Sequence, residues 1–276
     1  MSKALMGGRM ERCVAMLFLV SAALLAQGAN TCASEIDAKL FRGFDAAFVL
    51  LDTSSGACVR YNPEKCGCPE VPCSTFKIWN TLIGLELGLL RDPDAPFYHW
   101  DGVRRDFEAW NKDLTLREAF QVSCVPAYQE LARRIGVDRM RHYVDEVLRY
   151  GNRDISAGID IFWLTSRGKE PIKISPDQQV ELLSRLLAGK MDFKEGNVRI
   201  LHGVMLASKT EKGVLYGKTG SKMGKNGEGA LGWYVGFVES QGKTHIFACA
   251  ISGGVSPDGK TARLIVEDVL KSMDLL

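Results

Sequence analysis

The chain has 276 residues, of which 46% are hydrophobic and 25% charged, and its formal net charge is +2. This is the composition of an ordinary folded protein, long enough for one large domain or for two that pack closely together. A net charge this near zero argues against nucleic-acid binding, which requires a basic face, so we expect no nucleic-acid partner.

Residues 1–33 have the pattern of a secretory signal peptide. Basic residues precede an apolar run over 13–26, and small side chains follow that run. The run is shorter than the roughly 20 residues that a membrane span needs. We therefore predict cleavage near 28–33 and an exported, periplasmic protein with no stable membrane anchor. An uncleaved anchor is the alternative.

After this segment the sequence predicts strands, then a helical middle, then strands again. The runs 44–51 and 57–61 are separated by a turn rich in polar residues and glycine, which indicates a β-hairpin. A loop rich in Pro, Gly and Cys follows as far as Pro72. Residues 74–90 are apolar nearly all round, which indicates a helix buried in the middle of a domain.

Helical patterns continue as far as residue 207, with irregular stretches over 92–113 and 153–174. Thr115 is a predicted N-cap. The sequence Ser175-Pro176-Asp177-Gln178 is a capping box with proline at the first helical position. The expected helices are 116–120, 126–135, 138–150, 177–188 and 198–207.

The last part of the chain predicts three strands, 213–219, 231–239 and 244–252, and an amphipathic helix over 261–273. Glycine-rich turns between the strands favour an antiparallel meander. The predicted fold class is α/β of the α+β kind. An antiparallel sheet flanked by terminal helices (about 34–72 and 208–276) would stand beside an all-helical lobe (about 74–207).

Cysteines crowd the segment that precedes the buried helix. Export makes disulfides possible, so we expect pairing within this group, with a connectivity that the sequence does not determine. A zinc site is the alternative, but the spacing offers no clear fourth ligand, and we predict no metal site. Cys124 and Cys249 lie in apolar surroundings and are expected to be buried thiols. The crowded cysteines are Cys58, Cys66, Cys68 and Cys73.

Ser74 and Lys77 lie where the buried helix begins. Residues at i and i+3 share one face of a helix, so the hydroxyl and the amine can meet. Pro72 fits just before or in the first turn, which places Ser74 near free N–H groups that favour negative charge. A serine with a nearby base and oxyanion donors is what acyl transfer needs. Alone, however, Ser-x-x-Lys is common by chance.

Three further short motifs follow in order: Ser123-Cys124-Val125, Tyr150-Gly151-Asn152 and Lys218-Thr219-Gly220. All four together are a much stronger signal than any one. With them the sequence resembles the class D β-lactamases (oxacillinases) of the serine penicillin-recognising enzymes. The resemblance continues through Trp163-Leu164 and Gly232-Trp233 and covers nearly all of the chain after the signal peptide. It implies the β-lactamase/transpeptidase-like fold, in agreement with the predicted layout.

The resemblance implies hydrolysis of the β-lactam amide bond of penicillin-type antibiotics through an acyl-enzyme on Ser74. Lys77 would be carboxylated by CO2 and serve as general base in acylation and deacylation, so CO2 or bicarbonate is needed but no other cofactor. Carboxylation requires a neutral amine, which demands a dry pocket that lowers the lysine pKa. Trp163 has an indole N–H that can donate to the carbamate. The expected apolar walls are Phe76, Val125, Trp163 and Leu164.

The other motif residues would bind the substrate and move its proton. Ser123 would lie between Lys77 and Lys218 and relay a proton toward the leaving lactam nitrogen. Lys218 and Thr219, in the motif that Gly220 completes, would bind the substrate carboxylate.

Two expected contributors have no local motif of their own. Arg263 would be the second carboxylate-binding cation. The backbone N–H groups of Ser74 and Ser221 would form the oxyanion hole, so the Ser221 side chain need not take part. Tyr150 and Asn152 are expected to be structural. The histidines are scattered and expected to be non-catalytic; they are His99, His142, His202 and His245.

Three alternatives remain open. A β-lactam sensor domain would be acylated without turnover, but such receptor domains follow a membrane-spanning region. A D,D-peptidase acting on cell-wall peptide is disfavoured by Val125, because those enzymes usually carry asparagine there. A catalytically inactive relative is disfavoured because every motif residue is present. The expected partner is a small-molecule β-lactam substrate, and the chain is expected to be a monomer or a homodimer.

Overall fold

The computed structural model describes residues 36–166, 168–224 and 229–276. The predicted signal peptide and its cleavage near 28–33 lie outside the described residues, so the division between a signal and a mature chain stays a prediction. Within the described ranges, no helix combines the length and the apolar character that a membrane crossing would require.

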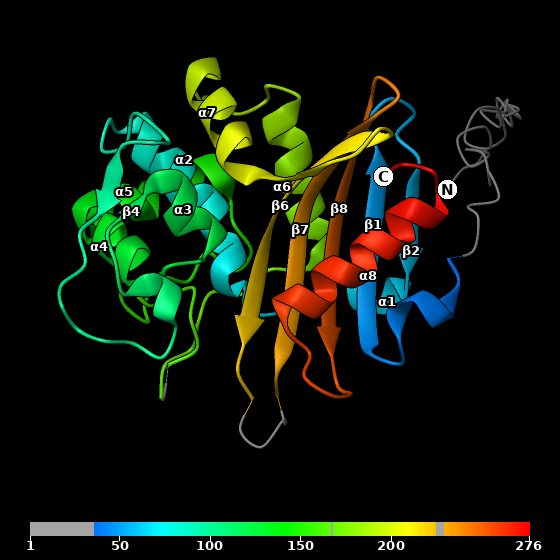
Figure 1. Ribbon diagram of the computed structural model, residues 1–276, viewed down its shortest axis with the longest axis horizontal. Helices are drawn as coiled ribbons and strands as arrows, with labels where there is room; N and C mark the ends of the chain where they lie inside the picture. The colour runs from blue at the N-terminus through cyan, green and yellow to red at the C-terminus, as the bar shows by residue number, and fades with distance from the viewer. Residues whose placement is uncertain (1–35, 167, 225–228) are drawn as a thin grey trace, which may run out of the picture. The chain divides into compact units, whose positions relative to one another are not determined.

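Six antiparallel strands form one sheet in the order β2-β1-β8-β7-β6-β5 (Figure 1). β1 pairs with β8 from Asp45 opposite Ser252 to Asp52 opposite His245, which joins the early hairpin to the late meander. The prediction that the early hairpin and the late strands share one antiparallel sheet is therefore confirmed. Its strands are β1 (Asp45–Asp52), β2 (Cys58–Tyr61), β5 (Leu206–Lys209), β6 (Gly213–Lys222), β7 (Leu231–Ser240) and β8 (Lys243–Ser252).

The two faces of this sheet cover two separate cores, because successive side chains of a strand point to opposite faces. On β8, Phe247 and Cys249 belong to the core shared with α8 (Gly259–Ser272). Ile246 and Ala248 belong to the other core, which continues into the helical lobe. Figure 1 shows α8 lying across the first face, as predicted for the terminal helix.

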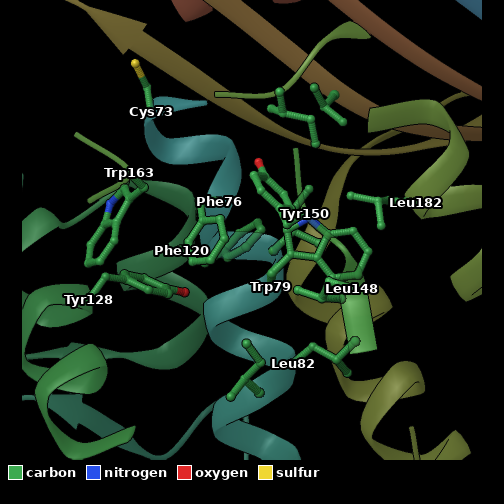
Figure 2. Packing of buried hydrophobic residues seen from close by; sticks show 14 of the residues in the cluster. Cys73, Phe76, Trp79, Leu82, Phe120, Tyr128, Leu148, Tyr150, Trp163 and Leu182 are labelled. Carbon is green, nitrogen blue, oxygen red and sulfur yellow. The ribbon is translucent and has the colours of Figure 1, made fainter. Parts of the chain in front are cut away.

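The helical lobe is built around α2 (Lys77–Glu86), whose residues from Lys77 to Leu85 are all buried. Figure 2 shows Trp79 of this helix and, around the helix, side chains from other elements, among them Phe120 and Tyr128. The all-apolar pattern of this stretch predicted that position. Further elements are α1 (Pro63–Cys66), β3 (Pro96–Tyr98), β4 (Leu114–Thr115), α3 (Leu116–Gln121), α4 (Val125–Ile135), α5 (Val137–His142), a π-helical stretch (Tyr143–Leu148), α6 (Pro176–Leu187) and α7 (Glu195–Met205).

Some boundaries differ from the prediction. The helix predicted over 74–90 begins as a 3-10 turn, η2 (Cys73–Phe76), and its α-helical part ends at Glu86. It ends there because the chain turns at Gly88, whose φ of 68° favours glycine. The helix predicted over 198–207 gives way to β5 at residue 206, since periodicity does not mark so short an edge strand.

The prediction of a disulfide before α2 is wrong, because all six described cysteines are free. Cys66 is buried with its thiol toward carbonyl oxygens on β1 and β2, whereas Cys68 is exposed. Cys73 is buried in the η2 turn. The four residues are close in sequence, but different elements carry their side chains into different surroundings. Cys124 and Cys249 are buried thiols, as predicted.

Candidate active site

Ser74 and Lys77 meet as their spacing predicted. The Nζ atom of Lys77 lies 2.7 Å from the Oγ atom of Ser74, within hydrogen-bond distance. Cys73, just before the serine, has a φ of 51°, a left-handed conformation that costs a non-glycine residue about 1 kcal/mol. This turn sets Ser74 at the entry to α2 and leaves it half-buried, so its hydroxyl stays partly accessible beside the amine.

Lys77 is the most unusual side chain of this site, because it is fully buried. Burial lowers its pKa from 10.5 to about 7, and the thiols of Cys124 and Cys73 act weakly in the opposite direction. Its Nζ atom lies 5.3 Å from the centroid of the Tyr128 ring. Within the described residues Lys77 forms no salt bridge with a carboxylate. A large fraction of this lysine is therefore uncharged near neutral pH.

Aromatic rings form the dry surroundings that the sequence predicted. Phe76 stacks on Trp163 with ring centroids 6.0 Å apart and meets Phe162 edge-on at 4.9 Å. The Nε1 atom of Trp163 is buried and has no hydrogen-bond partner among the described residues. A buried donor without an acceptor is costly, so this N–H is open to an acceptor that the unmodified chain does not supply.

The two other predicted wall residues lie at the margin of this region. Leu164 is half-buried and packs against the core cluster that contains Trp163. Val125 is the first residue of α4 and is also half-buried.

Lys218, on β6, is the second buried lysine of the site. Its Nζ atom donates to the carbonyl of Thr219 at 2.9 Å, approaches the Thr219 hydroxyl at 3.3 Å, and lies 5.6 Å from the Phe120 ring centroid. Burial lowers its pKa well below 10.5, and the charge of Lys77 lowers it further. Lys77 and Lys218 belong to different motifs, but they are close enough for the charge on Lys77 to lower the pKa of Lys218.

Ser123 occupies the short turn between α3 and α4. Its φ of 58° is left-handed, and its N–H donates to the Phe120 carbonyl at 3.1 Å. The residue is half-buried. Among the described residues no hydrogen bond joins its hydroxyl to either lysine, so the relay role of Ser123 stays a prediction.

β6 runs beside the Ser74 turn at the place where its own edge is open. β5 pairs with β6 only as far as Tyr216, so the following residues of β6 face η2. A Cβ atom on Gly220 would lie 2.9 Å from the Pro72 carbonyl oxygen and 3.3 Å from the Thr75 nitrogen. Glycine at this position of the Lys-Thr-Gly motif therefore permits the close approach of strand and turn.

Ser221 follows Gly220 and was predicted to contribute only its backbone. Its Oγ atom accepts a hydrogen bond of 2.9 Å from the N–H of Gly259, at the first residue of α8. The side chain is thus engaged by the first residue of the terminal helix, while the backbone role of Ser221 in the site stays a prediction.

Arg263, on α8, lines the same cavity as Lys218 and Thr219, although no local motif marked it. This cavity has a volume of about 280 Å³, and Ser74 is not part of its lining. The guanidinium donates to Glu267 at 2.7 Å and to the Ala207 carbonyl at 3.2 Å. The arginine is held in place and part of its charge is neutralised by Glu267.

The sequence reasoning missed Phe120, Tyr128 and Gln179, which contact the lysines or support the nucleophile turn. None of them lies within any of the four short motifs, although Phe120 and Tyr128 flank Ser123-Cys124-Val125. In the described part of the chain, no group of three or more His, Cys, Asp or Glu side chains is placed to hold a metal ion.

Known proteins are similar to this chain in both sequence and fold. The model of the penicillin-binding protein transpeptidase domain matches residues 47–271. A probable β-lactamase, YbxI of Bacillus subtilis, is 37% identical over 236 residues, which cover 86% of this chain and 84% of that protein. β-Lactamase OXA-10 of Pseudomonas aeruginosa is 37% identical over 205 residues, 74% of this chain and 75% of that protein.

Solved structures agree with these relatives. A class D β-lactamase from Bacillus subtilis matches with a TM-score of 0.81 at 35% identity, over 90% of this chain and 99% of that one. The C-terminal domain of the Bacillus licheniformis BlaR penicillin-receptor matches with a TM-score of 0.79 at 30% identity, over 86% of this chain and 94% of that one.

The chain belongs to the penicillin-binding protein transpeptidase family. Within that family the class D relatives extend over most of its length, and the chain is a serine β-lactamase of this class. β-Lactam hydrolysis in the broad sense follows from this membership.

Proposed function

We propose that the chain hydrolyses the amide bond of penicillin-type β-lactams through an acyl-enzyme on Ser74. The observation that carries this proposal is the buried Lys77 amine, 2.7 Å from the Ser74 hydroxyl and with a pKa of about 7. A neutral amine can be carboxylated, and the resulting carbamate can accept the serine proton as the oxygen attacks the lactam carbonyl. The backbone N–H groups of Ser74 and Ser221 are the proposed oxyanion hole.

Lys77 is proposed to act as its carboxylated form. A neutral amine adds to the carbon of CO2 and releases one proton, so the low pKa of Lys77 favours the modification. The product is an anion that needs donors in a dry pocket. The open N–H of Trp163 fits that need. We propose the carbamate as the general base of both acylation and deacylation, supplied by CO2 or bicarbonate without a metal or another cofactor.

Ser123, Lys218, Thr219 and Arg263 are proposed to handle the substrate. Ser123 would pass the proton toward the lactam nitrogen that leaves. Lys218, Thr219 and Arg263 line one cavity, which suits the substrate carboxylate. Because burial disfavours the charged form of Lys218, an arriving carboxylate would raise its pKa, and substrate binding would be coupled to protonation of this lysine.

A sensor that is acylated without turnover is the second candidate, supported by a specific relative. Regulatory protein BlaR1 of Bacillus licheniformis is 33% identical over 223 residues, but this chain spans only 36% of that protein. A D,D-peptidase is the third. We further propose an exported, periplasmic protein that acts without a membrane anchor, as a monomer or a homodimer.

One experiment separates these functions. Purified protein is given a chromogenic cephalosporin in CO2-free buffer and again with bicarbonate. Continuous turnover that rises with bicarbonate supports the hydrolase with a carboxylated lysine. A single stoichiometric burst would overturn the hydrolase proposal and favour the sensor. Lys77→Ala is expected to abolish deacylation and Ser74→Ala to abolish acylation, so full turnover by Lys77→Ala would refute the mechanism.

A further inference from the structure

A buried chain of hydrogen bonds connects α6 to the turn that carries Ser74. Gln179, on α6, is fully buried. Its Nε2 atom donates to the Thr75 hydroxyl at 3.0 Å, and the same hydroxyl donates to the Pro72 carbonyl at 2.8 Å. Since a hydroxyl has one proton, the two bonds define a direction, from Gln179 through Thr75 to the backbone before the serine.

This series of hydrogen bonds spans the strained part of the turn. Pro72 and Thr75 enclose Cys73, whose φ is 51°, and Ser74 itself. A strained conformation persists only where the surroundings hold it. The Thr75 N–H also donates to the Pro72 carbonyl at 3.2 Å, so that one oxygen accepts both bonds that close the turn. Fixing this oxygen fixes the direction in which the Ser74 side chain leaves the backbone.

Tyr150, the first residue of the Tyr-Gly-Asn motif, supports the same amide. The Nε2 atom of Gln179 lies 3.4 Å from the Tyr150 hydroxyl. The Tyr150 ring meets Phe76 edge-on, with centroids 5.0 Å apart. The nitrogen of the amide thus lies between two hydroxyl oxygens, while its oxygen is buried without a partner among the described residues. This arrangement turns the donor end of Gln179 toward the turn.

We propose that Gln179 is a positioning residue for the nucleophile. It holds the Thr75 hydroxyl on the Pro72 carbonyl and so keeps Ser74 in line with Lys77. Gln179 does not touch the substrate and acts only through Thr75. This inference rests on the proposed acylation of Ser74, whose chemistry it leaves unchanged.

The test compares the acylation rates of variants that retain or lose individual hydrogen bonds of this series. Stopped-flow single-turnover measurements with a chromogenic cephalosporin give the acylation rate and, separately, the dissociation constant of the non-covalent complex. One net hydrogen bond corresponds to a rate change of about threefold to tenfold. Gln179→Met should slow acylation by that factor with an unchanged dissociation constant. Thr75→Val, which keeps the shape, should do the same, whereas Thr75→Ser, which keeps the hydroxyl, should acylate at the wild-type rate.

A double variant and a neighbour on the same helix separate positioning from general stability. In Thr75→Val, the further change Gln179→Met should have little additional effect on the acylation rate, because the first change has already removed the hydrogen bond between the two side chains. Gln178→Ala removes the capping-box bond of 3.1 Å to the Ser175 N–H. It should lower the melting temperature but leave the acylation rate unchanged.

Three results would overturn the role of Gln179: a Gln179→Met rate within twofold of wild type, fully additive losses in the double variant, or an equal loss of rate in Gln178→Ala. Mass spectrometry of the wild type identifies the acylated residue. Absence of an adduct on Ser74 would overturn the proposed function and the positioning role together. A normal adduct with an unaffected Gln179→Met variant would overturn the positioning role alone.

Discussion

Replacing Lys77 by methionine should stabilise the unmodified protein, and the gain should shrink as the pH rises. Burial lowers the pKa of Lys77 to about 7 from the 10.5 of an unperturbed lysine. The folded chain therefore binds this proton more weakly than the unfolded chain, and folding is penalised at low pH. The penalty is full below the folded pKa and disappears as the pH reaches the unfolded pKa.

The magnitude follows from the two pKa values. With 1.36 kcal/mol per pKa unit, the penalty is about 4 kcal/mol at pH 7.5 and about 1 kcal/mol at pH 9.5. The difference in unfolding free energy between Lys77→Met and the wild type should thus fall by about 2–3 kcal/mol over these two pH units. Contributions that do not titrate, such as the lost bond to Ser74, cancel in this comparison.

Urea unfolding in CO2-free buffers at several pH values measures this difference. Lys65→Met is the matched control. Its hydrogen bond with Asp45 raises the pKa of Lys65, so this lysine is charged in both states throughout the window. The difference between the control and the wild type should stay constant. Parallel pH curves for Lys77→Met and the wild type would show that Lys77 keeps its proton when buried, which would refute the reasoning.

Three other changes test separate parts of the site. Gly220→Ala should lower kcat/KM by about tenfold or more, because its Cβ would lie 2.9 Å from the Pro72 oxygen; wild-type kinetics would contradict the close packing of β6 on the turn. Trp163→Phe keeps an aromatic side chain but removes the N–H, and should raise the bicarbonate concentration needed for half-maximal activity about tenfold; an unchanged requirement would exclude this donor. Reductant should leave the melting temperature unchanged, since Cys58, Cys66 and Cys73 are free. A clearly lower melting temperature under reductant would show that a disulfide is present after all.

The parts of this molecule that the sequence predicts are those that depend on near neighbours. The contact between Ser74 and Lys77 follows from a spacing of three residues, and the individual strands and α2 follow from their apolar patterns. The positions of the cysteines failed as a guide, because closeness in sequence does not bring side chains together when a strand, a short helix and a turn separate them.

Contacts between distant residues were beyond reach for a different reason. Thr75 and Gln179 are 104 positions apart, and nothing in the pattern of either segment indicates that they meet. The same holds for the cavity that places Arg263 beside Lys218. For Arg263 the family resemblance supplied what physical reasoning on the sequence alone lacks. Gln179 is part of no motif and was therefore missed.

The pairing of β1 with β8 has a consequence for the order in which the chain is made. Asp45 finds its partner at Ser252, so the middle of the sheet cannot close until nearly all of the chain has been synthesised. Contacts of such long sequence separation also form slowly, because a large loop must close first. A growing chain therefore has no central sheet until β8 has been synthesised and can pair with β1. That delay suits the proposed export, because a chain without its central sheet is still narrow enough to be threaded through a membrane.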